Sequence, residues 1–532
     1  MSMVDKATSK RLLAVHGWSG VILGLFLYVV VVTGAVAVMS HEIGEWSVSG
    51  AGTEAPLNQP LDARIRQLAE TVDPKYREDV SIFPNAAGTI QLFFHSHGTN
   101  SAGKPDDLGV RFMLAPKTLE VLARDEGYGT ELPDDPQSAL DYFLSMLHIS
   151  LHAPDPVGLY LTGLAGFVML AAVISGIILH KHLLRDLFVS PRLSSRLLNR
   201  RDRHILAGSW SLPFGFLLAF TGTFFSFAGA IGLPIVAMVS FGGDQVKMIE
   251  TLVGVPASVN KAPAVMANLD TMFAEASRRT GTKPEFVSIA HWGTADAKVQ
   301  VTTGPVESEI KYNNLVFHGI SGQFEGVKPD LGTKPSLGND IFGWMGPLHF
   351  GNFGGLLSKF VWVLLGFVTC YVTLTGLRLW VERRADDPVW QRLSRAIPTV
   401  SYGVPIGMAA SAVGFLLSFP KGDAVGWTAG GFLVGCAVSL LLGVVIGERD
   451  RLGRLMSVLL GALLVSLPFL RMAMGGADWA DLSATLRFVP IMLDVILFAG
   501  GVFGIAAGLR LQVPGLRGSQ INVGQTTAVP AE

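Results

Sequence analysis

The sequence predicts a polytopic α-helical membrane protein. In it, a duplicated two-span unit forms a four-helix bundle, two α+β domains lie outside the membrane, and four further transmembrane helices follow. The first observation is composition: 49% of the 532 residues are hydrophobic, 16% are charged, and the mean hydropathy is +0.43. Such values are typical of proteins with several membrane spans. The other two observations are long apolar segments and motifs that recur among the first four of them.

Eight apolar segments are long enough to cross a bilayer, which takes about 20 helical residues. They are residues 15–39, 157–180, 205–230, 357–380, 402–420, 424–446, 453–472 and 488–510. Lys and Arg precede the first segment and follow the second, fourth and sixth, so these connections all lie on one side. Because basic residues collect on the cytoplasmic side, both termini are expected in the cytoplasm.

The segments divide the chain into seven parts. These are an N-terminal segment with the first span (1–40), an outer domain (41–156), the second and third spans with a basic cytoplasmic loop (157–230), a second outer domain (231–356), the fourth span (357–385), a C-terminal four-helix module (401–511) and a cytoplasmic tail (512–532). In both outer domains a helix is expected before three strands, from hydrophobic periodicity and turn residues. The helices are Leu61–Val72 and Ala262–Arg279, and the strands are Val80–Phe83, Thr89–His95, Val110–Ala115, Glu285–Ala290, Lys298–Thr303 and Asn314–His318.

The duplication is visible as three motifs that each occur twice. His-x3-Gly-x12-Thr-Gly begins at His16 and again at His204. Gly-Phe-Val, followed by a Ser-Gly or Thr-Gly pair, begins at Gly166 and again at Gly366. A Leu-His pair precedes each of these latter copies, at 147–148 and 348–349, one residue out of register.

Matched histidines indicate a cofactor held between helices. If the two halves are related by an axis along the membrane normal, His16 faces His204 near the cytoplasm, and His148 faces His349 on the outer side. Two opposed imidazoles satisfy a six-coordinate haem iron, and helical bundles build such sites from facing helices. A zinc or copper site would need several N, S or carboxylate donors at one depth. We therefore expect two b-type haems and single out no catalytic side chain.

Two further histidines are candidate ligands. His152 follows His148 by one helical turn, on the same face, and could replace it. His180 ends the second span, but Trp380 stands at the equivalent position, so His180 ranks below the paired histidines. The alternative for any single histidine is an interfacial side chain that reaches the headgroups. A straight first span would also separate the two haem levels by about 35 Å, a distance too long for fast electron exchange without tilt or a bridging group.

The chain resembles the PepSY-associated transmembrane family, and its outer domains resemble PepSY domains. The matching stretches, within residues 10–385, are His16-Gly17-Trp18-Ser19-Gly20, Leu147-His148, Gly176-Ile177-Ile178-Leu179-His180-Lys181, Arg185-Asp186-Leu187-Phe188, Asp202-x-His204, Leu212-Pro213-Phe214 and Leu348-His349-Phe350-Gly351. The resemblance implies a bacterial inner-membrane protein of iron uptake, because some members are di-haem reductases of ferric siderophores. It does not extend to the last four spans.

The expected activity is therefore electron transfer from the cytoplasmic side to a periplasmic ferric siderophore or other ferric chelate. The donor is expected to be a quinol or a separate cytoplasmic protein, because the longest cytoplasmic loop, 181–204, is too short for a flavin or nicotinamide domain and has no glycine fingerprint. The alternatives are a non-enzymatic PepSY sensor or regulator, and a transport-accessory protein. The lipid bilayer is the other partner, and nucleic acid is not expected, because no basic tract carries aromatic side chains.

Overall fold

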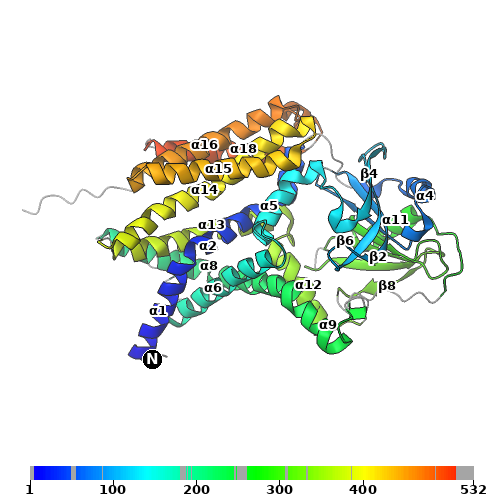
Figure 1. The fold of residues 1–532 in the computed structure, drawn as a ribbon, viewed down its shortest axis with the longest axis horizontal. Coiled ribbons are helices and arrows are strands. Elements are labelled where there is room, and N and C mark those ends of the chain that lie inside the picture. The colour runs from blue at the N-terminus through cyan, green and yellow to red at the C-terminus, as the bar shows by residue number, and fades with distance from the viewer. Residues whose placement is uncertain are drawn as a thin grey trace, which may run out of the picture.

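The computed structural model describes residues 5–48, 56–86, 88–179, 187–188, 190–192, 195–244, 247–248, 260–305, 310–330, 334–384, 386–485 and 487–510. It combines a bundle of long helices with a helix-covered β-sheet, which we call the sheet domain, at one end of that bundle (Figure 1). We call the end of the bundle that carries the sheet domain the sheet end. Helix α8 runs from the opposite end, where Arg200, Arg378 and Arg449 gather; we call that the basic end.

Among the described residues, seven helices are long and apolar enough to cross a membrane. They are α6 (Val157–Leu179), α8 (Arg196–Phe227), α13 (Gly355–Glu382), α14 (Pro388–Ser418), α15 (Ala424–Val445), α16 (Arg449–Ala473) and α18 (Phe488–Gly508). Two shorter helices, α1 (Lys6–Ile22) and α2 (Gly24–Ala37), complete an eighth span only as a bent pair. The chain is a multi-pass membrane protein.

The first expected span, 15–39, is not straight. Helices α1 and α2 meet at 66°, and Leu23 between them has non-helical torsions (φ −112°, ψ 3°). Gly20 and Gly24 flank this point, and each glycine weakens a helix by roughly 1 kcal/mol relative to alanine. A Cβ at Gly24 would lie 3.0 Å from the Leu377 side chain, so glycine also permits close packing on α13. As a result α1 packs against α6, whereas α2 packs mainly against α13.

The helices of the first four spans pack around a ring. The bent pair α1/α2 contacts α6 and α13, and α8 lies against both α6 and α13. Two short helices outside the spans, α5 (Ala139–Ile149) and α12 (Leu337–Phe350), enter this bundle from the sheet end. The bundle therefore receives side chains from six helical segments rather than from its spans alone.

The two outer segments, 41–156 and 231–356, build one sheet and not two separate domains. Its eight strands have the order β4-β3-β2-β1-β5-β6-β7-β8, and all neighbouring strands are antiparallel. They are β1 (Asp79–Pro84), β2 (Ile90–Thr99), β3 (Pro105–Leu114), β4 (Val121–Tyr128), β5 (Pro284–Ala290), β6 (Lys298–Thr303), β7 (Asn313–His318) and β8 (Phe324–Lys328). Strands β1 and β5 join the two segments, with Val80 opposite Ile289. Edge strands tend to pair, and here each segment's open edge is covered by the other.

Alternation fixes the two faces of the sheet. Val80, Phe94, Val299 and their neighbours fill one core, under helices α4 (Asp62–Glu70) and α11 (Leu269–Thr280). Each predicted strand is present, with bounds within five residues of those expected. Strands β4 and β8, at the two edges of the sheet, were not predicted because their sequences do not alternate regularly between apolar and polar residues. The expected helix 262–279 begins only at Leu269, capped by the Asn268 side chain.

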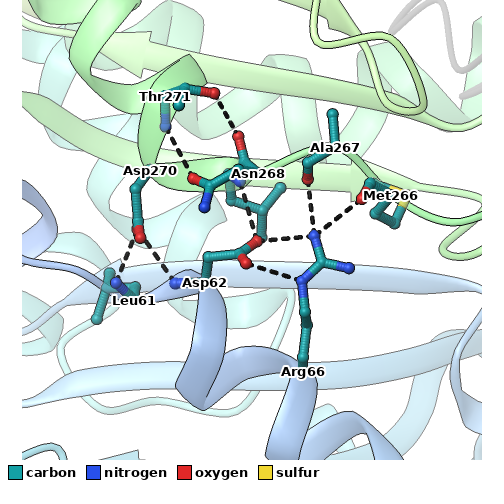
Figure 2. Close-up of polar contacts among 9 residues, drawn as sticks. Leu61, Asp62, Arg66, Met266, Ala267, Asn268, Asp270 and Thr271 are labelled. Atoms are coloured by element: carbon teal, nitrogen blue, oxygen red, sulfur yellow. Dashed lines mark hydrogen bonds and ion pairs between the residues drawn. The ribbon is translucent and has the colours of Figure 1, made fainter.

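Helices α4 and α11 also cap each other across the two segments (Figure 2). Asp270 Oδ1 accepts hydrogen bonds from the Leu61 and Asp62 backbone nitrogens, and Asp62 Oδ1 accepts one from the Leu269 nitrogen. Arg66 holds Asp62 at 2.8 Å and donates to the Met266 and Ala267 carbonyls. Carboxylates at helix N-termini satisfy orphan N–H groups and the helix dipole. The polar contacts thus unite the two segments, as the shared sheet does.

The last four spans form a second group of helices, in which α14 packs against α15 and α16 and also contacts α2 and α13 of the bundle. A buried ion pair lies at the sheet end of this group, where Arg471 and Asp494 meet at 2.7 Å with neither side chain exposed. Asp494 also accepts hydrogen bonds from Trp479 Nε1 (2.8 Å) and from Trp46 Nε1 (2.7 Å) of α3 (Ser40–Ser47). This enclosed pair therefore ties the C-terminal helices to the first half of the chain.

Candidate cofactor-binding site

The four paired histidines lie in two facing pairs inside the bundle. His16 of α1 and His204 of α8 have ring centroids 6.4 Å apart and planes at 75°. His148 of α5 and His349 of α12 have centroids 6.2 Å apart and planes at 21°. The pairing expected from the repeats is thus present as geometry, at two levels of the bundle.

Each ring is held through Nδ1. His16, His148 and His204 place Nδ1 at 3.1, 3.0 and 3.0 Å from the carbonyl oxygens of Ala172, Val30 and Val372. A carbonyl can only accept, so these nitrogens carry the proton and leave the Nε2 lone pair available. An imidazole with its distal N–H on a backbone oxygen is the usual arrangement of a histidine that ligates a metal.

His349 also carries its proton on Nδ1, but its partner is a hydroxyl and not a carbonyl. Its Nδ1 lies 2.8 Å from Thr221 Oγ1, and that hydroxyl donates its own proton to the Leu217 carbonyl at 2.8 Å. Thr221 therefore accepts from His349. At the other level, Ser175 and Thr375 lie 3.1 and 3.2 Å from the Nδ1 atoms of His16 and His204, beside the carbonyls.

The repeated Ser-Gly and Thr-Gly pairs are where the rings rest. A Cβ built on Gly34 would lie 2.7 Å from His148 Cε1, and one on Gly222 would lie 3.2 Å from His349 Cε1. At the basic end, the equivalent distances are 3.9 Å from Gly176 to His16 and 3.2 Å from Gly376 to His204. Every histidine of the two pairs thus faces the glycine of such a motif on a neighbouring helix.

This second set of contacts was missed in the sequence, although the motifs themselves were found. The repeated motif also has a glycine one helical turn after His16 and His204, but these two glycines do not contact the histidine rings. Gly20 has no neighbour within 4 Å, and Gly208 meets only Val372 Cγ1 at 3.8 Å. The signal for the true partners was the Ser/Thr before each distant glycine, but only the fold shows which histidine each one meets.

The paired rings fit one iron between them. With each Nε2 about 2 Å from a metal, as in other imidazole complexes, two opposed ring centroids lie about 6 Å apart. The observed 6.4 and 6.2 Å match this separation. For His148 and His349, whose helices lie outside the spans, burial lowers the pKa; a further contribution from His148 brings the pKa of His349 to about 3. Both are therefore neutral imidazoles, the form that ligates iron.

The two levels are closer together than a straight span implies. His148 and His349 precede the second and fourth spans in sequence, but α5 and α12 fold their rings back into the bundle, against Val30 and Thr221. Along α8, His204 and Thr221 are 17 residues apart, or about 26 Å. Between these levels Phe214 packs edge-on against Trp362 at 5.4 Å, and Trp362 Nε1 donates to the Leu348 carbonyl beside His349.

The two second-rank histidines are placed differently from the pairs. Helix α5 ends at Ile149, so His152 does not continue the helical face of His148 as expected. It has a positive φ of 53°, donates from Nε2 to the Phe143 carbonyl at 2.9 Å and stacks on the Phe143 ring. His180 lies outside the described residues. Its counterpart Trp380 packs against Trp18, with ring centroids 5.0 Å apart.

One cavity lies beside His349, and a second lies at the basic end of the molecule. The one at the sheet end has about 370 Å³ and is lined by Phe225, Phe342, Phe350, Tyr312, Asp330 and Asn352, among others. Phe225 and Phe350 both contact the His349 ring. The cavity at the basic end has about 280 Å³, and its lining includes Tyr402 and five arginines, at 200, 378, 449, 454 and 510. Arg200 precedes His204 by one helical turn.

Comparison with known proteins assigns the chain to a family. The family described as the PepSY-associated TM region matches residues 13–383, which include both histidine pairs and the sheet domain. This chain belongs to that family. An uncharacterised protein of Pseudomonas aeruginosa is 28% identical over 290 residues, which are 52% of this chain and 72% of that protein. The family resemblance seen in the sequence is thereby confirmed.

Proposed function

We propose that this chain is a haem-containing reductase of the bacterial inner membrane that passes electrons outward to a ferric chelate such as a siderophore. The observation that carries the proposal is the pair of facing imidazole sets, each ring held by Nδ1 and each pair spaced for one iron. His16 and His204 would hold one b-type haem, and His148 and His349 the other. Haem iron supplies a one-electron couple between Fe(III) and Fe(II).

The chain's own contribution is to fix and insulate these sites. Carbonyls and hydroxyls orient the imidazoles before any ligand arrives, so little ordering is needed when the ligand binds. The glycines of the Ser/Thr-Gly motifs let each ring approach the neighbouring helix. The apolar bundle excludes water and protons from both levels. Phe214 and Trp362 fill the space between the levels with aromatic side chains.

The electron's exit is the cavity beside His349. Its aromatic walls suit the apolar body of a chelate, and Tyr312, Asp330 and Asn352 offer polar contacts. One electron reduces the chelated Fe(III) to Fe(II). Hard oxygen chelators hold Fe(II) much less strongly than Fe(III), so reduction releases the metal. The chelate itself never has to enter the bilayer.

Electron entry belongs to the basic end. A quinol or a separate electron-carrying protein is the donor, and the arginine-lined cavity near His204 lies where either would approach. By the positive-inside rule this end is cytoplasmic, which puts the sheet domain in the periplasm and both termini in the cytoplasm. The two halves of the sheet and the matched Ser/Thr-Gly contacts are those expected of a duplicated two-span unit with PepSY-like outer halves.

A reduced-minus-oxidised spectrum of the purified protein tests the proposal. We expect b-type bands and about two haem equivalents per chain. His16→Ala and His349→Ala should each remove about one equivalent, whereas the matched control His318→Ala, in the sheet domain, should keep both. Dithionite-reduced protein should be reoxidised by a ferric chelate. A spectrum without b-type bands would reject the reductase and leave the family's anchor and sensor roles.

A further inference from the structure

A second group of histidines lies on the sheet domain, far in sequence from the pairs at 16 and 204. His95 and His97 stand on β2, Asp107 stands opposite on β3, and Asp79 stands on β1. Phe94, the residue before His95, points into the core with Val110. Because side chains alternate along a strand, His95, His97 and Asp107 occupy the other face of the sheet, away from α4 and α11.

Three of these side chains converge. His97 Nδ1 lies 2.7 Å from Asp107 Oδ1, and His95 Nδ1 lies 3.5 Å from Asp107 Oδ2. One donor atom from each of the three residues lies within 4.8 Å of the other two. Donor atoms that each lie about 2 Å from one ion are at most about 4 Å apart, so binding an ion would draw these three atoms slightly closer together. The residues come from two adjacent strands, so the sheet itself sets their spacing.

Both histidine rings are also held through Nε2, the nitrogen that does not face Asp107. The far nitrogen of His97, Nε2, lies 3.2 Å from Asp79 Oδ2, and the far nitrogen of His95, Nε2, lies 3.2 Å from Ser81 Oγ. Metal-ligating histidines commonly have their second nitrogen bound to a carboxylate or another oxygen in this way, which fixes the tautomer and the ring orientation. Asp79 and Ser81 thus act as positioning residues for the two rings.

His95 gives a second, independent indication that this cluster binds a ligand. The residue is 6% exposed, and among the described residues its buried Nδ1 has no hydrogen-bond partner, although Asp107 Oδ2 lies 3.5 Å away. A buried polar atom without a partner costs roughly 1–3 kcal/mol, so a native structure rarely keeps one without reason. The unpartnered nitrogen is the one that faces Asp107. His97, by contrast, has a half-exposed side chain and leaves an approach from solvent.

We propose that His95, His97 and Asp107 bind a divalent transition-metal ion on this face of the sheet. Two imidazoles and one carboxylate form a donor set of Zn²⁺ and of Fe²⁺ sites that keep open positions. An open, three-residue site suits an ion that is taken up and passed on. If the reductase proposal holds, the ion is the Fe²⁺ released from the chelate, and the site is its first protein-bound stop.

Zn²⁺ binding to the whole purified chain tests the site directly. The protein is stripped with a chelator, dialysed against Zn²⁺ and assayed for bound metal, with thermal unfolding recorded with and without the ion. We expect the wild type to hold one equivalent more than His97→Ala or Asp107→Asn, and to gain an unfolding-temperature increase that both variants lose. His318→Ala, a histidine of the same sheet outside the cluster, is the matched control and should behave as wild type.

The positioning residue gives a graded result. Asp79→Asn should keep the site but weaken Zn²⁺ binding roughly 10–100-fold, the usual effect of losing a carboxylate behind a histidine ligand. Unfolding temperatures without metal show that each variant is folded. Equal metal content in the wild type, His97→Ala and Asp107→Asn overturns the site, as does an equal loss in His318→Ala.

Anaerobic Fe²⁺ then tests which ion is used. Fe²⁺ retained by the wild type and lost from His97→Ala supports the iron assignment, and retention of Zn²⁺ alone rejects it. Haem bands are read from the same samples, and the site variants should keep both haems. Absent haem with intact metal binding would reject the reductase proposal and leave the metal site standing.

Discussion

Both histidine pairs place two imidazole rings close to each other inside the bundle, but they use different parts of the chain to do so. At the basic end, both histidines belong to spanning helices, α1 and α8, and meet carbonyls and hydroxyls of α6 and α13. At the sheet end, both belong to short helices, α5 and α12, which fold into the bundle against α2 and α8. The first pair is therefore built from the spans, and the second depends on how the sheet domain and its linking helices dock.

The histidines of the sheet domain differ from both pairs. The bundle imidazoles contact carbonyl and hydroxyl oxygens, and burial keeps His148 and His349 neutral. On the sheet, Asp107 and Asp79 raise the pKa of His97 to about 10. Neutral imidazoles suit an iron whose charge a macrocycle already balances, whereas carboxylates suit a free divalent ion.

The largest expected loss of stability comes from breaking the buried ion pair between Arg471 and Asp494, which lies at the sheet end. Asp494→Ala removes the partner of a fully buried Arg471 and also the acceptor of Trp46. Losing one side of a buried ion pair costs about 3–5 kcal/mol. We expect a large fall in unfolding temperature and earlier loss of the sheet-end haem than of the basic-end haem on heating. Simultaneous loss of both haems would show that the two pairs do not differ in their supports.

Glycine substitutions compare the two levels directly. Gly34→Ala puts a Cβ 2.7 Å from the His148 ring, which must shift, whereas at Gly176 the His16 ring is 3.9 Å away. We expect Gly34→Ala to lose about half of the bound haem. Gly176→Ala is the matched control and should keep both haems, with up to about 1 kcal/mol gained in helix stability. Haem per chain from the pyridine haemochrome spectrum is the measurement.

Loss of a hydroxyl should also affect the two levels unequally. Within the described part of the chain, His349 Nδ1 has Thr221 as its one acceptor, whereas His204 keeps the Val372 carbonyl when the Thr375 hydroxyl is removed. Thr221→Val should therefore cost about 1–3 kcal/mol in haem affinity, and Thr375→Val less. The midpoint potential of the sheet-end haem should rise, because a less basic imidazole stabilises Fe(III) less. Equal shifts from both variants in a redox titration would contradict this ordering.

The smallest effect concerns pH and the sheet domain. His97 has a folded-state pKa of about 10, raised chiefly by its hydrogen bonds to Asp107 and Asp79, against an ordinary value of 6.5. Its charged contacts are fully present below pH 6.5 and are lost as pH rises through about 10. The unfolding temperature of metal-free protein should fall slightly over that range. His97→Gln should flatten this slope, and an unchanged slope would assign it to other groups.

Much of this protein can be predicted from its sequence, because long apolar segments, basic flanks and strand alternation are local signals. They predict all eight spans without the bend in the first, six of the strands in the sheet and the pairing of His16 with His204. Strands β4 and β8 are not predicted from the sequence because an edge strand need not carry an apolar face. The expected position of His152 fails because a helical face cannot be extended past the end of its helix at Ile149.

Sequence by itself determined which residues recur: two histidine motifs, two Leu-His pairs and four Ser/Thr-Gly pairs. Only the tertiary structure decided what they do to one another. The bend at Leu23 turns His16 toward α6, and the fold of α5 and α12 brings His148 and His349 inward to Gly34 and Gly222. The physical reason is that a motif fixes spacing along one helix, whereas a ligand site requires contacts between helices that are far apart in sequence. Likewise, only the β1–β5 pairing joins the two outer segments into a single sheet.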